Sequence, residues 1–247
     1  MAAAARFCGV LLACVLQAAC DTDAPPRVAA VAPSPVLPVD SARLLDLGSE
    51  PGTWLTGGRD YQQSYFSPLQ AINRDNVASL GYAWHYDMEP EQGYEATPLV
   101  VDGVLYGSGP KGVVFALDAA SGRELWTFEP DIDLGFVRKV CCGVVNRGVA
   151  LWGDKLFVAA LDGYLYALRA SDGSIAWKVD TLTDRGRGYT VTGAPYIAND
   201  LVVIGNAGAE FDARGYVTAY DTDSGEQRWR FFTVPASPDG PFEHPEL

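Results

Sequence analysis

The stretch ALDAASGRELW occupies residues 116–126, and two later stretches repeat its pattern: ALRASDGSIAW at residues 167–177 and AYDTDSGEQRW at residues 219–229. The tryptophans that end the three stretches are 51 and 52 residues apart. Repeats of this length are typical of propeller blades, each of which is too small to bury its own faces and packs against its neighbours. The sequence therefore predicts an all-β fold, a β-propeller.

Turn signals divide each repeat into short strands. Asp102-Gly103 separates the apolar runs 99–101 and 104–106, and this dipeptide favours a tight hairpin. A Ser-Gly or Asp-Gly pair, such as Ser121-Gly122, precedes the last strand of each repeat. The repeat is thus predicted to be a meander of about four strands. Its tryptophan has the expected structural role of filling the space between blades.

An earlier stretch, LGYAW at residues 80–84, also ends in tryptophan. We expect it to form the strand that starts the first blade. With about 50 residues in each repeat, residues 48–247 form the predicted propeller domain of about four blades.

The composition excludes several classes of function. The 247 residues include 31 acidic and 18 basic side chains, a net charge of −13, which would repel a phosphate backbone, so no nucleic-acid partner is expected. The two histidines, His85 and His244, stand in no metal-ligand or triad spacing. This argues against zinc hydrolases and Ser-His-Asp enzymes.

Residues 1–20 have the pattern of a secretory signal peptide: Arg6, an apolar run over residues 7–16, and small residues before Cys20. The run is shorter than the about 20 residues that a membrane-spanning helix needs. Two forms of cleavage stay open, because Gln17 departs from the usual lipoprotein pattern: an ordinary site, or a lipoprotein site with a lipid anchor on Cys20. Residues 21–47 are rich in Ala and Pro and are predicted to be a linker. We therefore expect a periplasmic protein, membrane-anchored if it is lipidated.

The repeats resemble the pyrroloquinoline quinone (PQQ) repeat family, and the motifs between them resemble the quinoprotein and quinohaemoprotein alcohol dehydrogenases. The resemblance covers residues 53–247 and opens with WLTGGRD at residues 54–60. It implies an eight-bladed propeller of tryptophan-docking blades, of which this chain holds an incomplete set. It also implies PQQ as cofactor, with calcium or a lanthanide ion. The implied partners are a small primary alcohol as substrate and a cytochrome c as electron acceptor, with haem c on a further domain or partner.

Cys141 and Cys142 are adjacent. A bond between them would join Cα atoms about 3.8 Å apart, below the usual disulfide range, and would close almost no loop, so it would add little stability. Strain without stabilisation points towards function, and export would permit the bond. From the pair alone, two unbonded buried cysteines remain an alternative. The resemblance implies a disulfide that lies flat against one face of the quinone.

The resemblance also assigns cofactor contacts to Glu95, Arg147 and Thr192. Arg147 follows Cys142 by five residues in the segment GVVNRGVALW, and a guanidinium can bind one of the PQQ carboxylates in a two-pronged contact. Thr192, in TVTGAP at residues 190–195, would offer its hydroxyl to a carboxylate. Glu95 matches the acidic contact of the family.

The segment GNAGAEF at residues 205–211 matches the metal-binding part of the family site. Glu210 is the implied metal ligand, since calcium prefers several oxygen donors and a metal ion can polarise a carbonyl. The backbone of Gly208 and Ala209 is implied to lie along the edge of the cofactor.

In the family an aspartate removes the alcohol proton. The resemblance places this base, a second metal ligand and the ring on the other face of the cofactor beyond Leu247. We therefore expect this chain to be the amino-terminal part of a longer enzyme and to be inactive alone, and no residue is assigned as the catalytic base.

Two other interpretations fit the repeats. One is a non-enzymatic propeller scaffold that resembles the lipoprotein of the outer-membrane barrel assembly machinery. Such a scaffold has no reason to keep together the residues Cys141, Cys142, Arg147, Thr192 and Glu210. The other is a polyol or glucose dehydrogenase with the same cofactor, against which the adjacent cysteines argue.

Overall fold

The computed structural model describes residues 38–88, 93–138, 140, 143–237, 240 and 243. The predicted signal peptide with Cys20, the first part of the predicted linker, and both Cys141 and Cys142 lie outside the described residues. No helix in the described ranges is long and apolar enough to cross a membrane.

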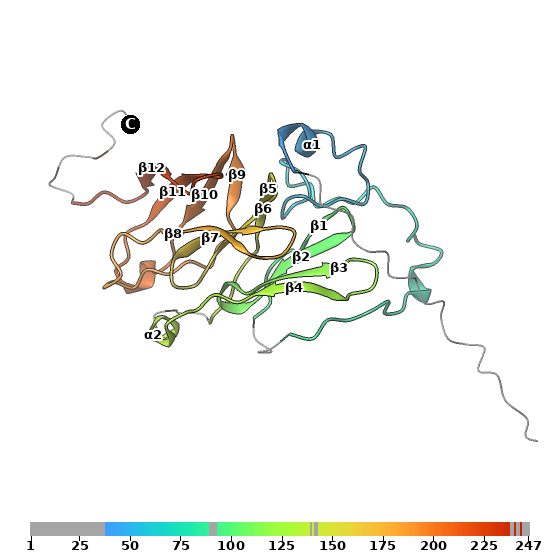
Figure 1. Ribbon diagram of the computed structural model, residues 1–247, viewed down its shortest axis with the longest axis horizontal. Helices are drawn as coiled ribbons and strands as arrows, with labels where there is room; N and C mark the ends of the chain where they lie inside the picture. Colours follow the sequence, from blue (N-terminus) through green and yellow to red (C-terminus); the bar gives the residue numbers. More distant parts are fainter. Residues whose placement is uncertain are drawn as a thin grey trace, which may run out of the picture.

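Three antiparallel four-stranded sheets, here called blades 1 to 3, follow one another along the chain (Figure 1). The strands of each blade pair in chain order. The all-β prediction is confirmed. Blade 1 contains β1 (Leu99–Val101), β2 (Val104–Ser108), β3 (Val114–Asp118) and β4 (Glu124–Phe128); blade 2 contains β5 (Ala150–Trp152), β6 (Lys155–Ala159), β7 (Tyr164–Arg169) and β8 (Ile175–Asp180); blade 3 contains β9 (Tyr196–Ala198), β10 (Leu201–Gly205), β11 (Tyr216–Asp221) and β12 (Gln227–Phe232).

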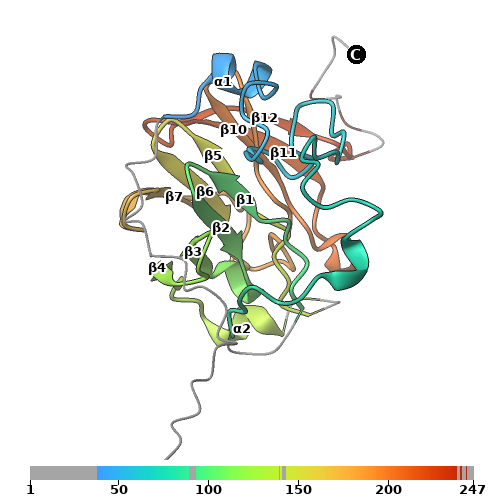
Figure 2. The ribbon, with the colours of Figure 1, turned by 90° about the vertical axis from the view of Figure 1, so that its right-hand side faces the viewer.

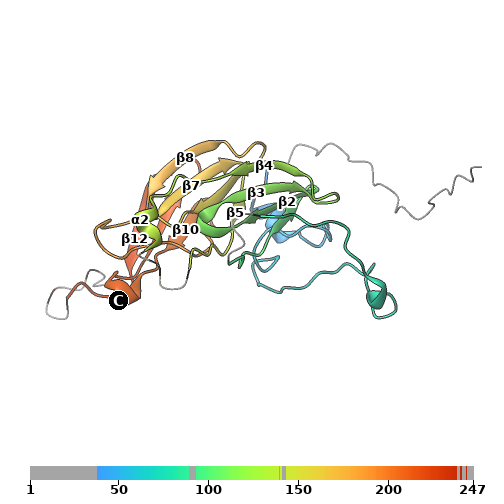
Figure 3. The same cartoon turned by 90° about the horizontal axis from the view of Figure 1, so that it is seen from below.

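Helical structure is confined to short segments around the sheets. These are α1 (Ser41–Leu45) and α2 (Leu134–Val137), with the 3-10 turns η1 (Val77–Ser79), η2 (Pro110–Gly112) and η3 (Ala209–Phe211). The segment around η1 stands away from the sheets (Figure 3). In agreement, Ile72, Val77 and Leu80 are each more than half exposed.

The predicted hairpin turns form as expected. Asp102 and Gly103 both have positive φ angles, 50° and 77°, and connect the paired residues Val101 and Val104. Such a two-residue turn requires positive φ at both positions, which glycine adopts without strain and aspartate tolerates. The register of blade 1 follows from this turn.

Blades 1 and 2 are locked together by a tryptophan. Nε1 of Trp126, on the last strand of blade 1, donates a hydrogen bond to the carbonyl of Ala170 in blade 2 (3.1 Å). Its ring covers Gly173, where an added Cβ would lie 2.5 Å from the indole. Trp177 binds Thr222 of blade 3 in the same way. The expected structural role of these rings between blades is thus confirmed.

Trp84 makes the same contact on the other face of blade 1. Its Nε1 donates to the carbonyl of Ala119 (3.2 Å), and a Cβ on Gly122 would lie 2.5 Å from its ring. The expectation that residues 80–84 form the strand that starts a blade is not met, because they belong to no sheet of the described structure. Trp84 instead occupies the position of the closing tryptophan of a preceding blade. The described residues thus contain three complete blades and this one element of another.

The segment 38–55 ties blades 1 and 2 together beside their first strands (Figure 2). Val39 exchanges two backbone hydrogen bonds with Gly153 (2.9 and 2.7 Å), and Trp54 exchanges two with Val100. Val39 is fully buried in the same apolar cluster as Leu44. Residues 39–47, which the sequence assigns to the linker, therefore pack as part of the folded body.

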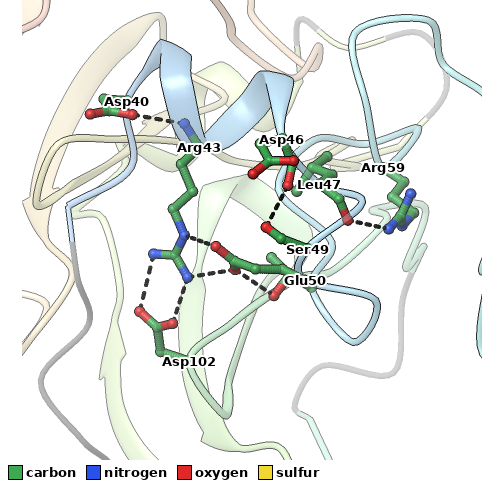
Figure 4. A network of polar contacts seen from close by, with 9 residues as sticks. Asp40, Arg43, Asp46, Leu47, Ser49, Glu50, Arg59 and Asp102 are labelled. Atoms are coloured by element: carbon green, nitrogen blue, oxygen red, sulfur yellow. Dashed lines mark hydrogen bonds and ion pairs between the residues drawn. The ribbon is translucent and has the colours of Figure 1, made fainter.

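An ionic network holds this segment in place (Figure 4). The guanidinium of Arg43 in α1 lies between the carboxylates of Glu50 and Asp102, and the Arg43 side chain is only 12% exposed. The side chain of Asp40 caps the helix by accepting from the backbone N–H of Arg43. These hydrogen bonds from Arg43 hold the pKa of Glu50 below its ordinary value.

Candidate functional site

Arg147 lies in the loop before β5, and it meets two of the other predicted contacts. Its Nη1 donates to Oγ1 of Thr192 (2.8 Å), and its Nη2 lies 3.0 Å from Oε2 of Glu95. Its backbone N–H also donates to the carbonyl of Thr192 (3.0 Å). Three residues that the sequence assigns to one site are therefore in direct contact.

The propeller repeat explains why these residues meet. Glu95, Arg147 and Thr192 each precede the first strand of their own blade, β1, β5 and β9. The chain before β1 forms a parallel bridge with the chain before β5, between Tyr94 and Asn146. Equivalent positions of consecutive blades are thus neighbours in space.

A cavity of about 220 Å³ opens beside Arg147. Arg147, Thr192, Gly208 and Glu210 line it, all of them predicted site residues. The remaining lining residues include Val140, Gly143, Val145, Thr190, Ala207 and Phe211. Val140 and Gly143 flank Cys141 and Cys142 in the sequence, and these two cysteines lie outside the described residues.

The segment after β10 contributes Ala207, Gly208, Glu210 and Phe211 to the lining of the cavity. Gly208 has a φ angle of 108°, and a Cβ there would lie 2.0 Å from the carbonyl oxygen of Gly188, so only glycine fits. Backbone hydrogen bonds between Thr190 and Ala207 fasten this segment to the chain that carries Thr192. Ala209 begins η3 beside Gly208, but it is not part of the cavity lining in the described structure.

Glu210 supplies one exposed carboxylate to the cavity. In the part of the chain that the structure describes, no group of three or more His, Cys, Asp or Glu side chains is arranged to hold a metal ion. A calcium-like ion needs six to eight oxygen ligands. Glu210 can therefore contribute one carboxylate to such a site, and the other oxygen ligands must come from groups other than clustered side chains of the described residues.

The donor set suits a flat, anionic ligand. Arg147 offers five N–H donors, and its contacts with Glu95 and Thr192 orient the planar guanidinium at the cavity. Its side chain is 48% exposed, so a ligand carboxylate can reach it. The small residues Gly143, Ala207 and Gly208 in the lining leave room for a ring system. The residues present thus fit a polycarboxylated aromatic cofactor such as PQQ.

Sequence reasoning missed Asn146, which directly precedes Arg147. Its side chain is 1% exposed and accepts a hydrogen bond from Oγ of Ser108 (2.6 Å). The sequence signal is the spacing Asn146-Arg147-Gly148, since an asparagine oxygen can accept from the backbone N–H two residues on. That bond is present, at 3.1 Å.

Comparison with known proteins agrees with this geometry. The quinohemoprotein alcohol dehydrogenase ADH-IIG of Pseudomonas putida is 51% identical over 205 residues, which cover 83% of this chain and 29% of that protein. Its solved structure superposes with a TM-score of 0.82 at 50% identity, covering 84% of this chain and 30% of that one. The 1-butanol dehydrogenase (cytochrome c) of Thauera butanivorans is 47% identical over 78% of this chain and 28% of its own length.

A europium-containing methanol dehydrogenase has a similar structure, with a TM-score of 0.74 and 36% identity over 78% of this chain and 34% of that one. The chain spans about a third or less of the length of the curated relatives it matches. Residues 54–246 match the family described as "PQQ: Glucose/ethanol/alcohol dehydrogenase, beta-propeller domain". Because this match covers most of the chain, the protein belongs to the PQQ-dependent dehydrogenase propeller family.

Proposed function

We propose that the protein containing this chain is a PQQ-dependent alcohol dehydrogenase, and that Arg147 and Thr192 bind a carboxylate of the cofactor. The observation that carries this proposal is the contact of Arg147 with Glu95 and Thr192 at the rim of one cavity. Relatives that are 51% and 47% identical are named as alcohol dehydrogenases. Their names favour the alcohol branch over a glucose dehydrogenase and over a non-enzymatic scaffold.

Bound PQQ would supply the two-electron chemistry, as acceptor of the hydride from the alcohol carbon. The residues of this chain bind and orient the cofactor. Glu95 and Thr192 hold the Arg147 guanidinium in one orientation before a ligand arrives, which lowers the entropic cost of binding. Two contacts leave N–H donors of Arg147 for a ligand carboxylate, and charge-assisted bonds of this kind are among the stronger hydrogen bonds.

The other predicted site residues also contact the cofactor or the metal ion in the proposed enzyme. Glu210 is a ligand of the calcium or lanthanide ion, and the backbone of Gly208 and Ala209 lies along the cofactor edge. A disulfide between Cys141 and Cys142 lies against one face of the ring system. It is supported by Val140 and Gly143, which bracket the pair in the sequence and both line the cavity.

For the whole protein we propose export to the periplasm through residues 1–20, with either ordinary cleavage or lipidation at Cys20. The proposed substrate is a small primary alcohol and the proposed electron acceptor is a cytochrome c. One relative is named a 1-butanol dehydrogenase (cytochrome c), which supports both partners. Haem c would then belong to a further domain or to a partner.

A titration of the intact protein with PQQ and calcium, followed by tryptophan fluorescence or calorimetry, tests the proposal. Arg147→Lys is expected to weaken PQQ binding at least tenfold, because an ammonium cannot make the two-pronged contact. Arg169→Lys is the matched control, since Arg169 is exposed on β7 of blade 2 and its guanidinium donates to Oγ of Ser174 within its own turn, outside the cavity lining. Unchanged affinity in Arg147→Lys, or no PQQ binding by the unmodified protein, would contradict the proposal.

A further inference from the structure

Both the oxygen and the nitrogen of the buried Asn146 side-chain amide make hydrogen bonds. Its Oδ1 accepts from Oγ of Ser108 (2.6 Å) and from the backbone N–H of Gly148 (3.1 Å). Its Nδ2 donates to the carbonyl of Ala159 (2.9 Å). Because the side chain is only 1% exposed, water cannot replace these bonds, and an unmet partner would carry the full cost of desolvation.

The three partners come from different parts of the propeller. Ser108 ends β2 of blade 1, and Ala159 ends β6 of blade 2. Gly148 belongs to the loop itself and has a φ angle of 140°. Asn146 thus fixes the loop to two neighbouring blades at the residue before Arg147.

The position of Asn146 fixes the backbone from which the Arg147 side chain extends. The backbone of Asn146 bridges to Tyr94, which places Glu95 beside Arg147, and the next N–H, that of Arg147, donates to Thr192 in the approach to blade 3. The pair Asn146-Arg147 is therefore attached to all three blades. A shift of this loop would move Arg147 relative to both Glu95 and Thr192.

We propose that Asn146 is a positioning residue, which holds Arg147 in the orientation that binds the cofactor carboxylate; this inference rests on the proposed function. Asn146 does not itself line the cavity in the described structure, so it acts through Arg147. Asparagine is required because one side chain must both accept two bonds and donate a third. Aspartate keeps the acceptors, loses the donor to Ala159 and adds a buried charge.

Two measurements on the intact protein test the proposal: PQQ affinity by titration, and hydrogen–deuterium exchange of residues 143–149 without cofactor. In Asn146→Ala, and to a smaller degree in Ser108→Ala, we expect the amides of Arg147 and Gly148 to exchange about tenfold faster. We expect PQQ affinity to fall about tenfold in Asn146→Ala. Ser108→Ala removes only one of the bonds and serves if Asn146→Ala does not fold.

Thr181→Val is the matched control for stability. Thr181 is also 1% exposed, and its Oγ1 donates one buried hydrogen bond, to Gly163, away from the cavity lining. This variant should lower the unfolding temperature and leave PQQ affinity and the exchange of residues 143–149 unchanged.

The outcomes separate the two proposals. Equal losses of PQQ affinity in Asn146→Ala and Thr181→Val would show that Asn146 has a structural role only and would overturn the positioning role. An exchange rate of residues 143–149 that does not change in Asn146→Ala would overturn it as well. If the unmodified protein binds no PQQ, the proposed function fails. The exchange experiment then decides by itself whether Asn146 holds Arg147.

Discussion

Arg147 and Glu95 form an ion pair, with Nη2 and Oε2 3.0 Å apart, although 52 residues separate them in the sequence. That separation is one residue more than the 51 between Trp126 and Trp177, the tryptophans on the last strands of the same two blades. The pair is thus a contact between corresponding segments of consecutive blades, each just before the first strand. An ion pair with both side chains near half exposure adds little stability, so its value lies in the orientation of Arg147.

The hydroxyl of Thr192 provides a direct test of that orientation. Thr192→Val keeps the shape of the side chain and removes the acceptor for Nη1 of Arg147, so we expect about tenfold weaker PQQ binding. Thr192→Ser should restore most of the affinity. The exposed Thr183 gives the control Thr183→Val. A serine variant as weak as the valine variant would show that the methyl group and not the hydroxyl matters.

The docking of Trp126 predicts a large effect of one methyl group. Gly173→Ala would place a Cβ 2.5 Å from the indole at a φ angle of 72°, and we expect a loss of about 3 kcal/mol in the free energy of unfolding. Gly103→Ala is the matched control, because its φ angle of 77° is similar and no atom lies within 4 Å. It should cost only the about 1 kcal/mol of the left-handed backbone. Urea unfolding measures both, and equal losses would refute the docking argument.

The Arg43 network predicts a stability that depends on pH. Arg43→Met leaves the carboxylates of Glu50 and Asp102 without their shared cation, and at pH 7 we expect a loss of about 2–3 kcal/mol in the free energy of unfolding. The pKa of Glu50 is lowered by Arg43, so this contribution is present above the ordinary pKa of 4.5 and is lost as the pH falls through the folded value.

Urea unfolding at pH 7 and at about pH 3 measures the change, and the difference between Arg43→Met and the unmodified protein should shrink at the lower pH. Arg228→Met is the control, because Arg228 is 46% exposed where it pairs with Asp221, and it should cost clearly less stability than Arg43→Met. A loss that is the same at both pH values would contradict the role of the carboxylates.

Asp162 predicts a pH effect of the opposite sign. Burial raises the pKa of this carboxyl, so the folded protein holds its proton more tightly, and stability falls as the pH rises from 3.8 through the folded pKa. Asp162→Asn should therefore raise the unfolding temperature at pH 7, with no gain at about pH 3.

Asp172→Asn is the comparison, because bonds from Ser174 lower the pKa of that carboxyl, and its substitution should bring no gain at pH 7. Thermal unfolding measured across the pH range would contradict the argument if Asp162→Asn were stabilising at every pH.

The repeats made the blades predictable, because each blade is encoded by a local pattern of strands, turns and a closing tryptophan. Arg147 and Thr192 could be placed in one site because the segments that contain them resemble the cofactor motifs of the family. Residues 80–84 resemble the end of a repeat, but whether Trp84 starts or closes a blade depends on its contact with Ala119, which no local pattern shows. Residues 39–47 look like a linker because their burial depends on distant partners such as Gly153. Asn146 was missed because its role depends on hydrogen bonds with Ser108 and Ala159, each more than ten residues away in the sequence.

The docking tryptophans all make their contacts in the same direction along the row of blades. Trp84, Trp126 and Trp177 each reach forward, from one repeat onto a glycine turn of the next, while Trp229 is 43% exposed. Each blade in such a stack contacts only its neighbours. A substitution in a glycine turn therefore loosens the contact with the preceding blade, and a substitution of a tryptophan loosens the contact with the following blade. The indole emission of each tryptophan is then a local signal for one interface, so substituting them singly would reveal the order in which the blades separate.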